Sequence, residues 1–185
     1  MAVKKRRIML ELSDKSIRKA RKQLLQYQAD MQYKLGLFVS LLINKGYKVA
    51  MRNKGDYSAY IMILQHTDEV DENSAKGILM AYNVQTCIRE YMVSATEIKR
   101  VEISPVLMAE FGSGWKAKNE FPDVTGVGQG TFPGQIHAFD PGGWSYMTPD
   151  GMWHRSSGEE PSMPMLKAKR RMEREITKTI KEVWK

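Results

Sequence analysis

The chain has 185 residues, is 42% hydrophobic and carries a formal net charge of +8, and this length predicts a single domain. No apolar run reaches the roughly 18 to 20 residues that a membrane-spanning helix requires, so we expect no membrane association. The only cysteine, Cys87, excludes an intramolecular disulfide and a cysteine-rich zinc site, and we interpret it as a small core residue rather than a nucleophile.

The first residues are basic, and the apolar stretch after them is interrupted by Glu11, Ser13 and Asp14. A secretory signal needs an unbroken apolar region at this place, so we expect the protein to be made and used without secretion. Residues 7–12 form a short apolar run that is compatible with a strand.

A long helix is predicted from about residue 14 to residue 44. Ser13 offers a side-chain oxygen to cap it, and Asp14 suits the dipole of its first turn. Asn44 and Gly46 provide the expected stop. Apolar residues recur every three or four positions and form one stripe along this helix. The stripe consists of Ile17, Ala20, Leu24, Tyr27, Met31, Leu35, Phe38 and Leu42.

Strands are predicted in the middle of the chain. Residues 47–52 and 57–65, joined by a turn at 53–56, have the pattern of a hairpin. A charged loop at 66–76 separates them from further runs that are rich in β-branched and aromatic residues. These runs are 77–86, 87–96 and 98–103.

Two more helices are predicted after the strands. Pro105 suits the first turn of a short helix through 106–111, which Gly112 closes. Ser162 can cap a final helix that has Pro164 in its first turn. The apolar stripe of this final helix is Met165, Ala168, Met172, Ile176, Ile180 and Val183, and its expected solvent-facing ion pairs are Arg171–Glu175 and Lys178–Glu182.

These elements predict an α+β fold in one domain that spans residues 1–185. We expect a mainly antiparallel sheet, packed by the long N-terminal helix and the C-terminal helix. The positive charge lies at the two ends of the chain, where residues 1–22 carry a net +7 and residues 163–185 a net +5. This charge has two interpretations: a sequence-independent contact with DNA, or the solvated faces of two amphipathic helices.

The segment from 112 to 162 is predicted to be an extended loop. It holds 10 of the 14 glycines and 3 of the 4 tryptophans. A flexible linker would be polar and poor in aromatic residues, and loops longer than about 15 residues are usually functional or disordered. Large aromatic side chains can anchor the chain on another surface, which favours an interface completed only in an assembly. These residues are Trp115, Phe121, Phe132, Phe139, Trp144 and Trp153.

The sequence gives little support for a metal site, a dinucleotide site or a catalytic site. His66, His137 and His154, with Asp140 or Asp150, have no spacing typical of a zinc site, so we predict no metal and expect His137 and His154 to form hydrogen bonds within the loop. The glycines at 126, 128 and 130 are followed by Thr131-Phe-Pro133, which forbids the helix that a dinucleotide site needs. Nothing in the sequence indicates that Glu110 and Asp123 lie close together as a catalytic pair of carboxylates. No serine, histidine and aspartate have the spacing of a known family of triad enzymes. We therefore predict no catalytic residues and no cofactor.

Several motifs in the second half of the chain nevertheless resemble a known family. In chain order they are Met108-Ala-Glu-Phe-Gly-Ser-Gly114, Thr131-Phe-Pro-Gly134, His137-Ala-Phe-Asp-Pro-Gly-Gly-Trp144, Asp150-Gly-Met-Trp-His154 and Met163-Pro-Met165. Their order and spacing are similar to those of the minor tail-component, or head–tail joining, proteins of long-tailed double-stranded DNA phages, which include tail-completion and tail-terminator proteins. The resemblance covers roughly residues 104–185, and the first hundred residues agree only in outline.

The resemblance implies a non-enzymatic virion protein that forms a ring, most often sixfold, at the neck or at the head-proximal end of the tail. It implies other neck and tail proteins as partners, namely a head-closure or stopper protein and the tail tube. DNA would pass through the channel without sequence-specific binding, and assembly would take place in the host cytoplasm. The subunit-interface residues that we predict are Glu110, Phe111, Gly112, Trp115, Phe132, Phe139, Trp144 and Trp153.

A ring is built from heterologous contacts, in which one patch meets a different patch on the neighbour, and buried aromatic residues often dominate the energy of such contacts. The alternative is a basic DNA-binding or DNA-processing protein, as the sequence pI of about 9.5 allows. A steep fall of the duplex-binding constant with salt would support this alternative.

Overall fold

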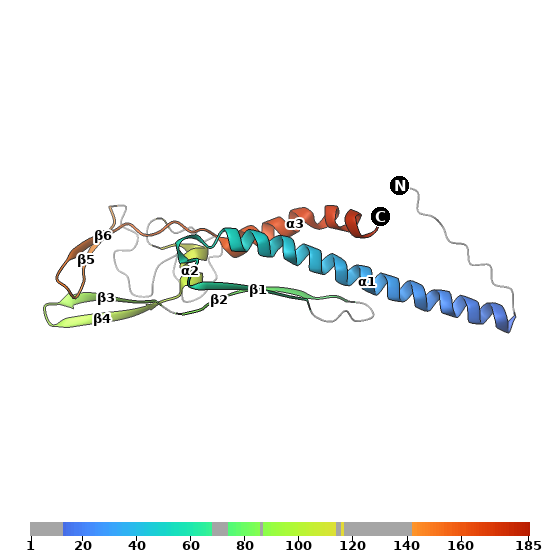
Figure 1. Cartoon of the computed structure of the whole chain (residues 1–185). Helices are drawn as coiled ribbons and strands as arrows, with labels where there is room; N and C mark the ends of the chain where they lie inside the picture. Colours follow the sequence, from blue (N-terminus) through green and yellow to red (C-terminus); the bar gives the residue numbers. More distant parts are fainter. Residues whose placement is uncertain (1–12, 68–73, 86, 114–115, 117–141) are drawn as a thin grey trace.

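The computed structural model describes residues 13–67, 74–85, 87–113, 116 and 142–185 of the chain (Figure 1). The fold is α+β, as predicted. Its elements are α1 (Asp14–Arg52), the short 3-10 helix η1 (Gly55–Tyr57), β1 (Ile61–Thr67), β2 (Gly77–Asn83), β3 (Cys87–Ser94), β4 (Glu97–Ile103), α2 (Pro105–Phe111), β5 (Trp144–Met147), β6 (Trp153–Ser156) and α3 (Pro164–Val183). The predicted strand at 7–12 lies outside the described residues.

The molecule is elongated, with α1 along its length (Figure 1). The helix α3 lies beside the C-terminal half of α1, and the β1–β2 hairpin lies along the same half. The helix α2 lies beside the C-terminal end of α1, and the hairpins β3–β4 and β5–β6 form the end far from the start of α1. The strands that the structure describes are therefore spread over three antiparallel two-stranded sheets rather than one sheet.

The start of α1 is set locally, as predicted. The backbone N–H of Ser16 donates to Ser13 Oγ at 3.4 Å, and the backbone N–H of Ser13 donates to Ser16 Oγ at 3.3 Å. This reciprocal pair is a capping box, with serine in the place where glutamate is more usual.

The predicted end of α1 is wrong, because the helix continues past Asn44 and Gly46 to Arg52. Gly46 is buried against α3, where a Cβ atom would lie 2.7 Å from Met172 Sδ. The glycine thus allows two helices to approach closely, and it does not end the first of them. The predicted hairpin is also wrong, because its first strand, 47–52, is the last part of α1.

The remaining strands are confirmed with shifted bounds. β1 starts at Ile61 and pairs with β2, from Ile61 opposite Asn83 to Thr67 opposite Gly77. β3 pairs with β4 in the same antiparallel way. The partner of β1 therefore follows it in the chain, since the residues that precede it belong to a helix.

The hydrophobic core is small and lies where α1, β1, α2 and α3 meet. It is formed by Ala50, Ile61, Ile63, Ala109 and Ala168. Three of these five residues are alanines, so the elements approach one another closely, and the other buried apolar side chains include Ile43, Ile103, Met108, Leu166 and Val183. The part of the chain that the structure describes contains no helix long and apolar enough to cross a membrane.

The short helix α2 forms as predicted, with Ser104 Oγ accepting from the Leu107 N–H, Pro105 in the first turn and Gly112 at its end. For α3 the predicted cap is wrong. Met163 occupies the N-cap position with φ of 52° and provides no side-chain cap, whereas Ser162 Oγ donates to the Ala109 carbonyl oxygen.

The predicted apolar stripe of α3 is only partly buried. Ile176 and Ile180 are 39% and 44% exposed, whereas Glu175 and Thr179 are buried. The buried face is polar here because it meets a lysine of α1. The predicted loop from 112 to 162 also needs a correction, because it contains the β5–β6 hairpin.

Candidate assembly surface

A carboxylate from α2 caps the start of α3. Glu110 Oε2 accepts a hydrogen bond from the Met165 N–H at 2.9 Å, and Glu110 Oε1 accepts one from the Leu166 N–H at 2.8 Å. The first N–H groups of a helix have no partner within the helix, and the helix dipole favours a negative charge beside them. Glu110 therefore fixes the start of α3 to the end of α2.

The two ends of the long loop are held together beside this cap. The Ser113 N–H donates to the Glu159 carbonyl at 3.0 Å, and the Glu159 N–H donates to the Ser113 carbonyl at 3.1 Å. Gly112 has φ of 71°, and a Cβ atom there would lie 2.4 Å from the Glu159 carbonyl oxygen. The chain thus leaves the body at residue 113 and returns to the same place at residue 159.

The returning chain is fastened to α2 and η1. The Ala109 carbonyl accepts from the Ser162 and Met163 N–H groups, each at 2.9 Å. The Tyr57 hydroxyl donates to the Glu159 carboxylate. These bonds place the end of the loop directly before the first turn of α3.

The predicted interface residues at 110–112 thus have a role within the chain. Gly112 is buried, and Glu110 and Phe111 are half-buried. Glu110 caps α3, and Gly112 lets the returning chain pass close to the end of α2. Their contribution to a contact between subunits stays a prediction.

The predicted aromatic contacts are only partly placed. Trp153 is 71% exposed and lies in β6, opposite Met147 of β5. Trp144 begins β5. The remaining predicted interface residues, Trp115, Phe132 and Phe139, lie outside the described residues. The structure therefore brings 110–112 together with the base of the loop, and it places Trp153 on a hairpin within that loop.

The histidines that the structure describes lie in separate hairpins. His66 is in β1, whereas His154 is in β6, where its Nε2 lies 3.1 Å from Thr148 Oγ1. The same threonine hydroxyl donates to Asp150, and this bond lowers the pKa of the Asp150 carboxyl. His137 and Asp140 lie outside the described residues. Across the described ranges, no three His, Cys, Asp or Glu residues gather as a metal site would require.

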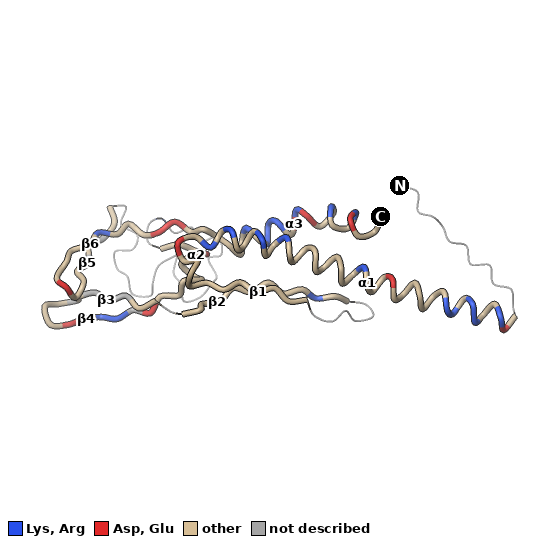
Figure 2. The backbone as a smooth tube through the Cα atoms, viewed as in Figure 1, with Lys and Arg blue, Asp and Glu red and all other residues tan. Residues whose placement is uncertain are grey.

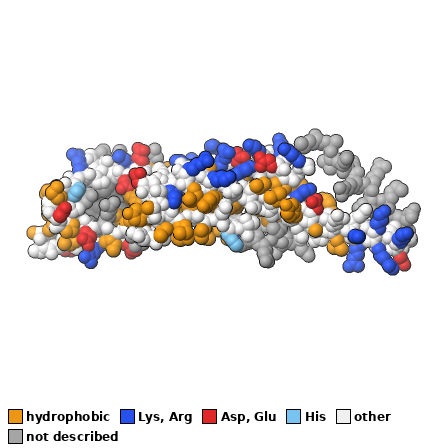
Figure 3. Space-filling view, viewed as in Figure 1, with side chains coloured by type: hydrophobic (Ala, Val, Ile, Leu, Met, Phe, Trp, Pro, Cys, Tyr) orange, Lys and Arg blue, Asp and Glu red, His pale blue; other side chains and the backbone are white. Residues whose placement is uncertain are grey.

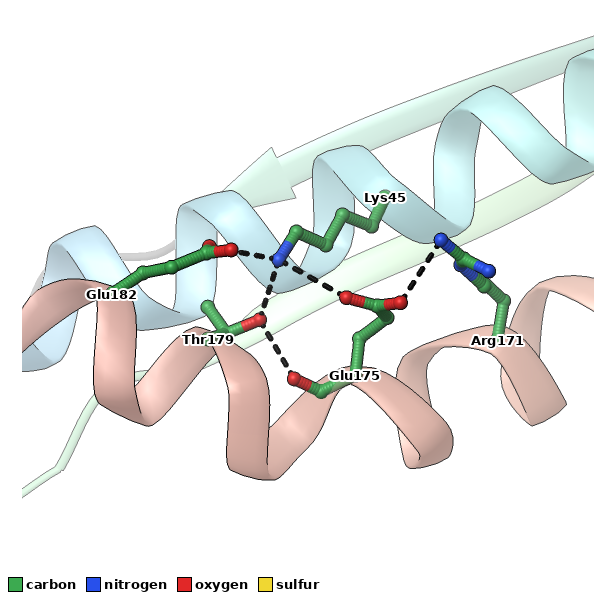
Figure 4. A network of polar contacts seen from close by, with 5 residues as sticks. All are labelled: Lys45, Arg171, Glu175, Thr179 and Glu182. Atoms are coloured by element: carbon green, nitrogen blue, oxygen red, sulfur yellow. Dashed lines mark hydrogen bonds and ion pairs between the residues drawn. The ribbon is translucent and has the colours of Figure 1, made fainter.

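A polar cluster joins α1 to α3 (Figure 4). Lys45 Nζ of α1 donates to Thr179 Oγ1 at 2.8 Å, to Glu182 Oε2 at 2.9 Å and to Glu175 Oε2 at 3.4 Å. The predicted pair Arg171–Glu175 is present at 2.9 Å, although Glu175 is buried rather than solvent-facing. The hydrogen bond between Lys45 and Glu182 raises the pKa of the lysine and lowers the pKa of Glu182.

Replacing Lys45 by methionine is expected to lower the free energy of unfolding by about 1 kcal/mol near neutral pH, because the pair is only partly shielded from water. The raised lysine pKa makes this contribution complete below pH 10.5 and lost as the pH rises further. The lowered pKa of Glu182 makes it complete above pH 4.5 and lost as the pH falls. Urea denaturation of both proteins across this range measures the difference.

Lys48, which is exposed on the same helix, provides the control. The Lys48→Met variant should differ little from the unchanged protein at any pH. If the effect of Lys45→Met were the same at pH about 3, 7 and 11, the cluster would not be an electrostatic link between the helices.

Within the described ranges, two apolar surfaces are left exposed. The first is the α1 arm, which we define as residues 14–30 of α1. Residues 21–30 are all exposed, and this part of the helix extends past the rest of the body (Figure 1). Its exposed apolar side chains are Ile17 (52%), Leu24 (57%), Leu25 (59%) and Tyr27 (55%). Ile17, Leu24 and Tyr27 belong to the stripe that is packed farther along α1, where the ring centre of Phe38 lies 5.9 Å from that of Trp184, the residue after α3.

The second surface is the outer sheet face, which we define as Met62, Leu64, Met80 and Tyr82. In this order, their exposed fractions are 41%, 43%, 45% and 40%. Met62 lies opposite Tyr82, and Leu64 lies opposite Met80. The alternate residues Ile61 and Ile63 are buried in the core. Figure 3 shows hydrophobic side chains gathered on the side of the body where β1 and β2 lie.

Sequence reasoning missed the outer sheet face, although a signal was present. The runs 61–64 and 78–82 are apolar at consecutive positions. A strand with only one covered face alternates apolar and polar residues, whereas a continuous apolar run is typical of a strand covered on both faces. No family model, curated protein or solved structure matches the chain, so a function has to be argued from these surfaces.

Proposed function

We propose that the protein is a structural component of a tailed phage virion, which joins or terminates the tail at the neck or at the head-proximal end. Copies of the chain form a ring, most simply a hexamer, around the DNA channel. The protein is assembled in the host cytoplasm and acts without catalysis and without a cofactor. Its partners are a head-closure or stopper protein and the tail tube.

The observation that carries the proposal is the pair of uncovered apolar surfaces on an elongated chain. Exposed apolar patches of this kind mark interaction sites in soluble proteins. Among the described residues, the α1 arm and the outer sheet face remain exposed outside the buried core. A subunit that is completed by its neighbours accounts for both surfaces. The motifs at 108–114 and 131–165, which resemble those of head–tail joining proteins, favour the same function.

We expect the purified protein to form a closed oligomer of several chains, each of 21.2 kDa. Size-exclusion chromatography with light scattering measures the mass, and negative-stain electron microscopy shows whether the particle is a ring. In virions, antibody labelling should mark the neck or the upper end of the tail. A protein that stayed monomeric at high concentration, also with its neighbouring virion components, and that never labelled the neck would contradict the proposal.

The alternative function, binding of DNA, is favoured by one specific observation. The α1 arm holds five cations within eight residues, and Lys15, Arg18, Lys19, Arg21 and Lys22 are all exposed. Figure 2 shows this group at the start of α1. If all five contacted phosphates, the logarithm of the binding constant would fall with the logarithm of salt concentration with a slope of about −4.5. A slope near zero would exclude this alternative.

A further inference from the structure

We propose that the α1 arm of one copy packs on the outer sheet face of the next copy. The inference rests on the proposed function and specifies the contact that builds the oligomer. Every copy carries both of the surfaces that would meet in this contact. One is an exposed amphipathic helix, and the other is a two-stranded sheet with one exposed apolar face. A helix on an apolar sheet face is the usual two-layer arrangement of such elements.

The chain already contains this arrangement once. The C-terminal half of α1 covers the inner face of the β1–β2 hairpin, where Gly77 lies so close to the helix that a Cβ atom would be 2.5 Å from Ile43 Cγ1 and 2.7 Å from Val39 Cγ1. The arm continues the apolar stripe of that same helix. A neighbour's arm on the outer face would make β1 and β2 strands with two covered faces, as their continuous apolar runs predict.

The arm cannot reach the outer sheet face of its own chain. The helix α1 is continuous from Asp14 to Arg52, and its C-terminal half is fixed to the opposite, inner face of the same hairpin. The arm extends past the end of that hairpin (Figure 1). Both surfaces can therefore be covered by each other only between copies.

The arm is long enough to cover the outer sheet face. At 1.5 Å per residue the arm is about 25 Å long, whereas the outer sheet face spans three residues of each strand, or about 10 Å along the strands. A contact of arm to sheet is heterologous, so repeating it gives a ring where the rotation closes.

Cysteine cross-linking tests the contact in the assembled protein. A Cys87→Ser background removes the only native thiol, and Leu24→Cys with Leu64→Cys then places one thiol on each surface. Under oxidation this double variant should give a ladder of covalent multimers that ends at the ring number. The single Leu24→Cys and Leu64→Cys variants in the same background should stay as uncrosslinked chains. In the proposed contact, an arm does not meet another arm, and an outer sheet face does not meet another outer sheet face.

Charge substitution provides a second measurement. Leu24→Asp and Leu64→Asp change exposed side chains, so the far-ultraviolet circular dichroism should be unchanged while the oligomer falls to the mass of one chain. An equal mixture of the two variants should form a heterodimer and nothing larger, because only one intact arm and one intact sheet face remain. Ile88→Asp, at a residue of β3 that is 65% exposed, is the matched control and should leave the oligomer intact.

The outcomes separate this inference from the proposed function. Cross-linking of the Leu24→Cys variant alone would show that arms pair with arms and would overturn the inference. An intact oligomer without any cross-link between positions 24 and 64 would also overturn it, while the proposed function would stand. A chain that stays monomeric without any substitution, also with its neighbouring virion components, would overturn the inference, and the same result together with no labelling of the neck would overturn the proposed function as well.

Discussion

Replacing Gly112 by alanine is expected to lower the free energy of unfolding by about 3 to 5 kcal/mol. With φ of 71° and ψ of −162°, this residue has a backbone conformation that is almost restricted to glycine, and strain there costs on the order of 1–3 kcal/mol. An added Cβ atom would also lie 2.4 Å from the Glu159 carbonyl oxygen and 2.8 Å from Pro161 Cδ. Backbone and proline ring cannot rotate away as a flexible side chain can, so overpacking adds a further cost of about 1–3 kcal/mol.

Urea denaturation with a far-ultraviolet signal measures this loss, and Gly151 provides a matched control. Gly151 also has a positive φ, of 80°, but a Cβ atom there would meet nothing within 4 Å. Gly151→Ala should therefore cost only the strain, about 1–2 kcal/mol. Equal losses in the two variants would show that the close approach of residue 112 to the returning chain does not constrain the fold.

Replacing Glu110 by alanine is expected to lower the free energy of unfolding by about 2 kcal/mol. Both carboxylate oxygens accept backbone N–H groups of the first turn of α3, and the N-cap residue Met163 provides no side-chain cap of its own. Loss of a cap costs about 0.5–2 kcal/mol, and hydrogen bonds to charged groups are at the strong end of that range.

A graded series tests the same prediction. Glu110→Gln keeps one acceptor oxygen, so it should lower the free energy of unfolding by about half as much as Glu110→Ala. Urea denaturation again measures the difference. Glu173→Ala is the control, because this α3 residue has an exposed side chain in an ion pair with Lys169 at 3.9 Å, and such pairs contribute little. If Glu110→Ala and Glu173→Ala gave equal losses, the carboxylate would not hold α3 in place.

These two residues change the interpretation of the motif at 108–114. The sequence predicts Glu110 and Gly112 as surface contacts between subunits, because their motif resembles that of ring-forming proteins. In the structure Glu110 caps α3, and Gly112 leaves room for the chain that returns at residue 159. The motif thus fixes the base of the loop, and whether the loop itself reaches a neighbour stays a prediction.

The candidate surfaces were predictable only in part. The stripe on the first helix is evident from its spacing, since helical periodicity involves residues three or four apart. That Leu24 and Leu25 are exposed while Ile43 is buried does not follow from that spacing. It depends on where α3 and the hairpin end along α1, which is a property of the packed molecule.

By itself, the sequence determined the local features of the fold, which depend on residues only a few positions apart. Ser13 begins α1, Pro105 lies in the first turn of α2, Gly112 ends it, and antiparallel strands occupy the region between the long helices. Only the tertiary structure decided that α1 continues through Gly46, because that glycine faces Met172 of a distant helix. Likewise, the cap of α3 comes from a residue 55 positions away, and Lys45 finds Glu175 across 130 positions. Capping and periodicity act over one helical turn, whereas these contacts exist only once the elements have packed.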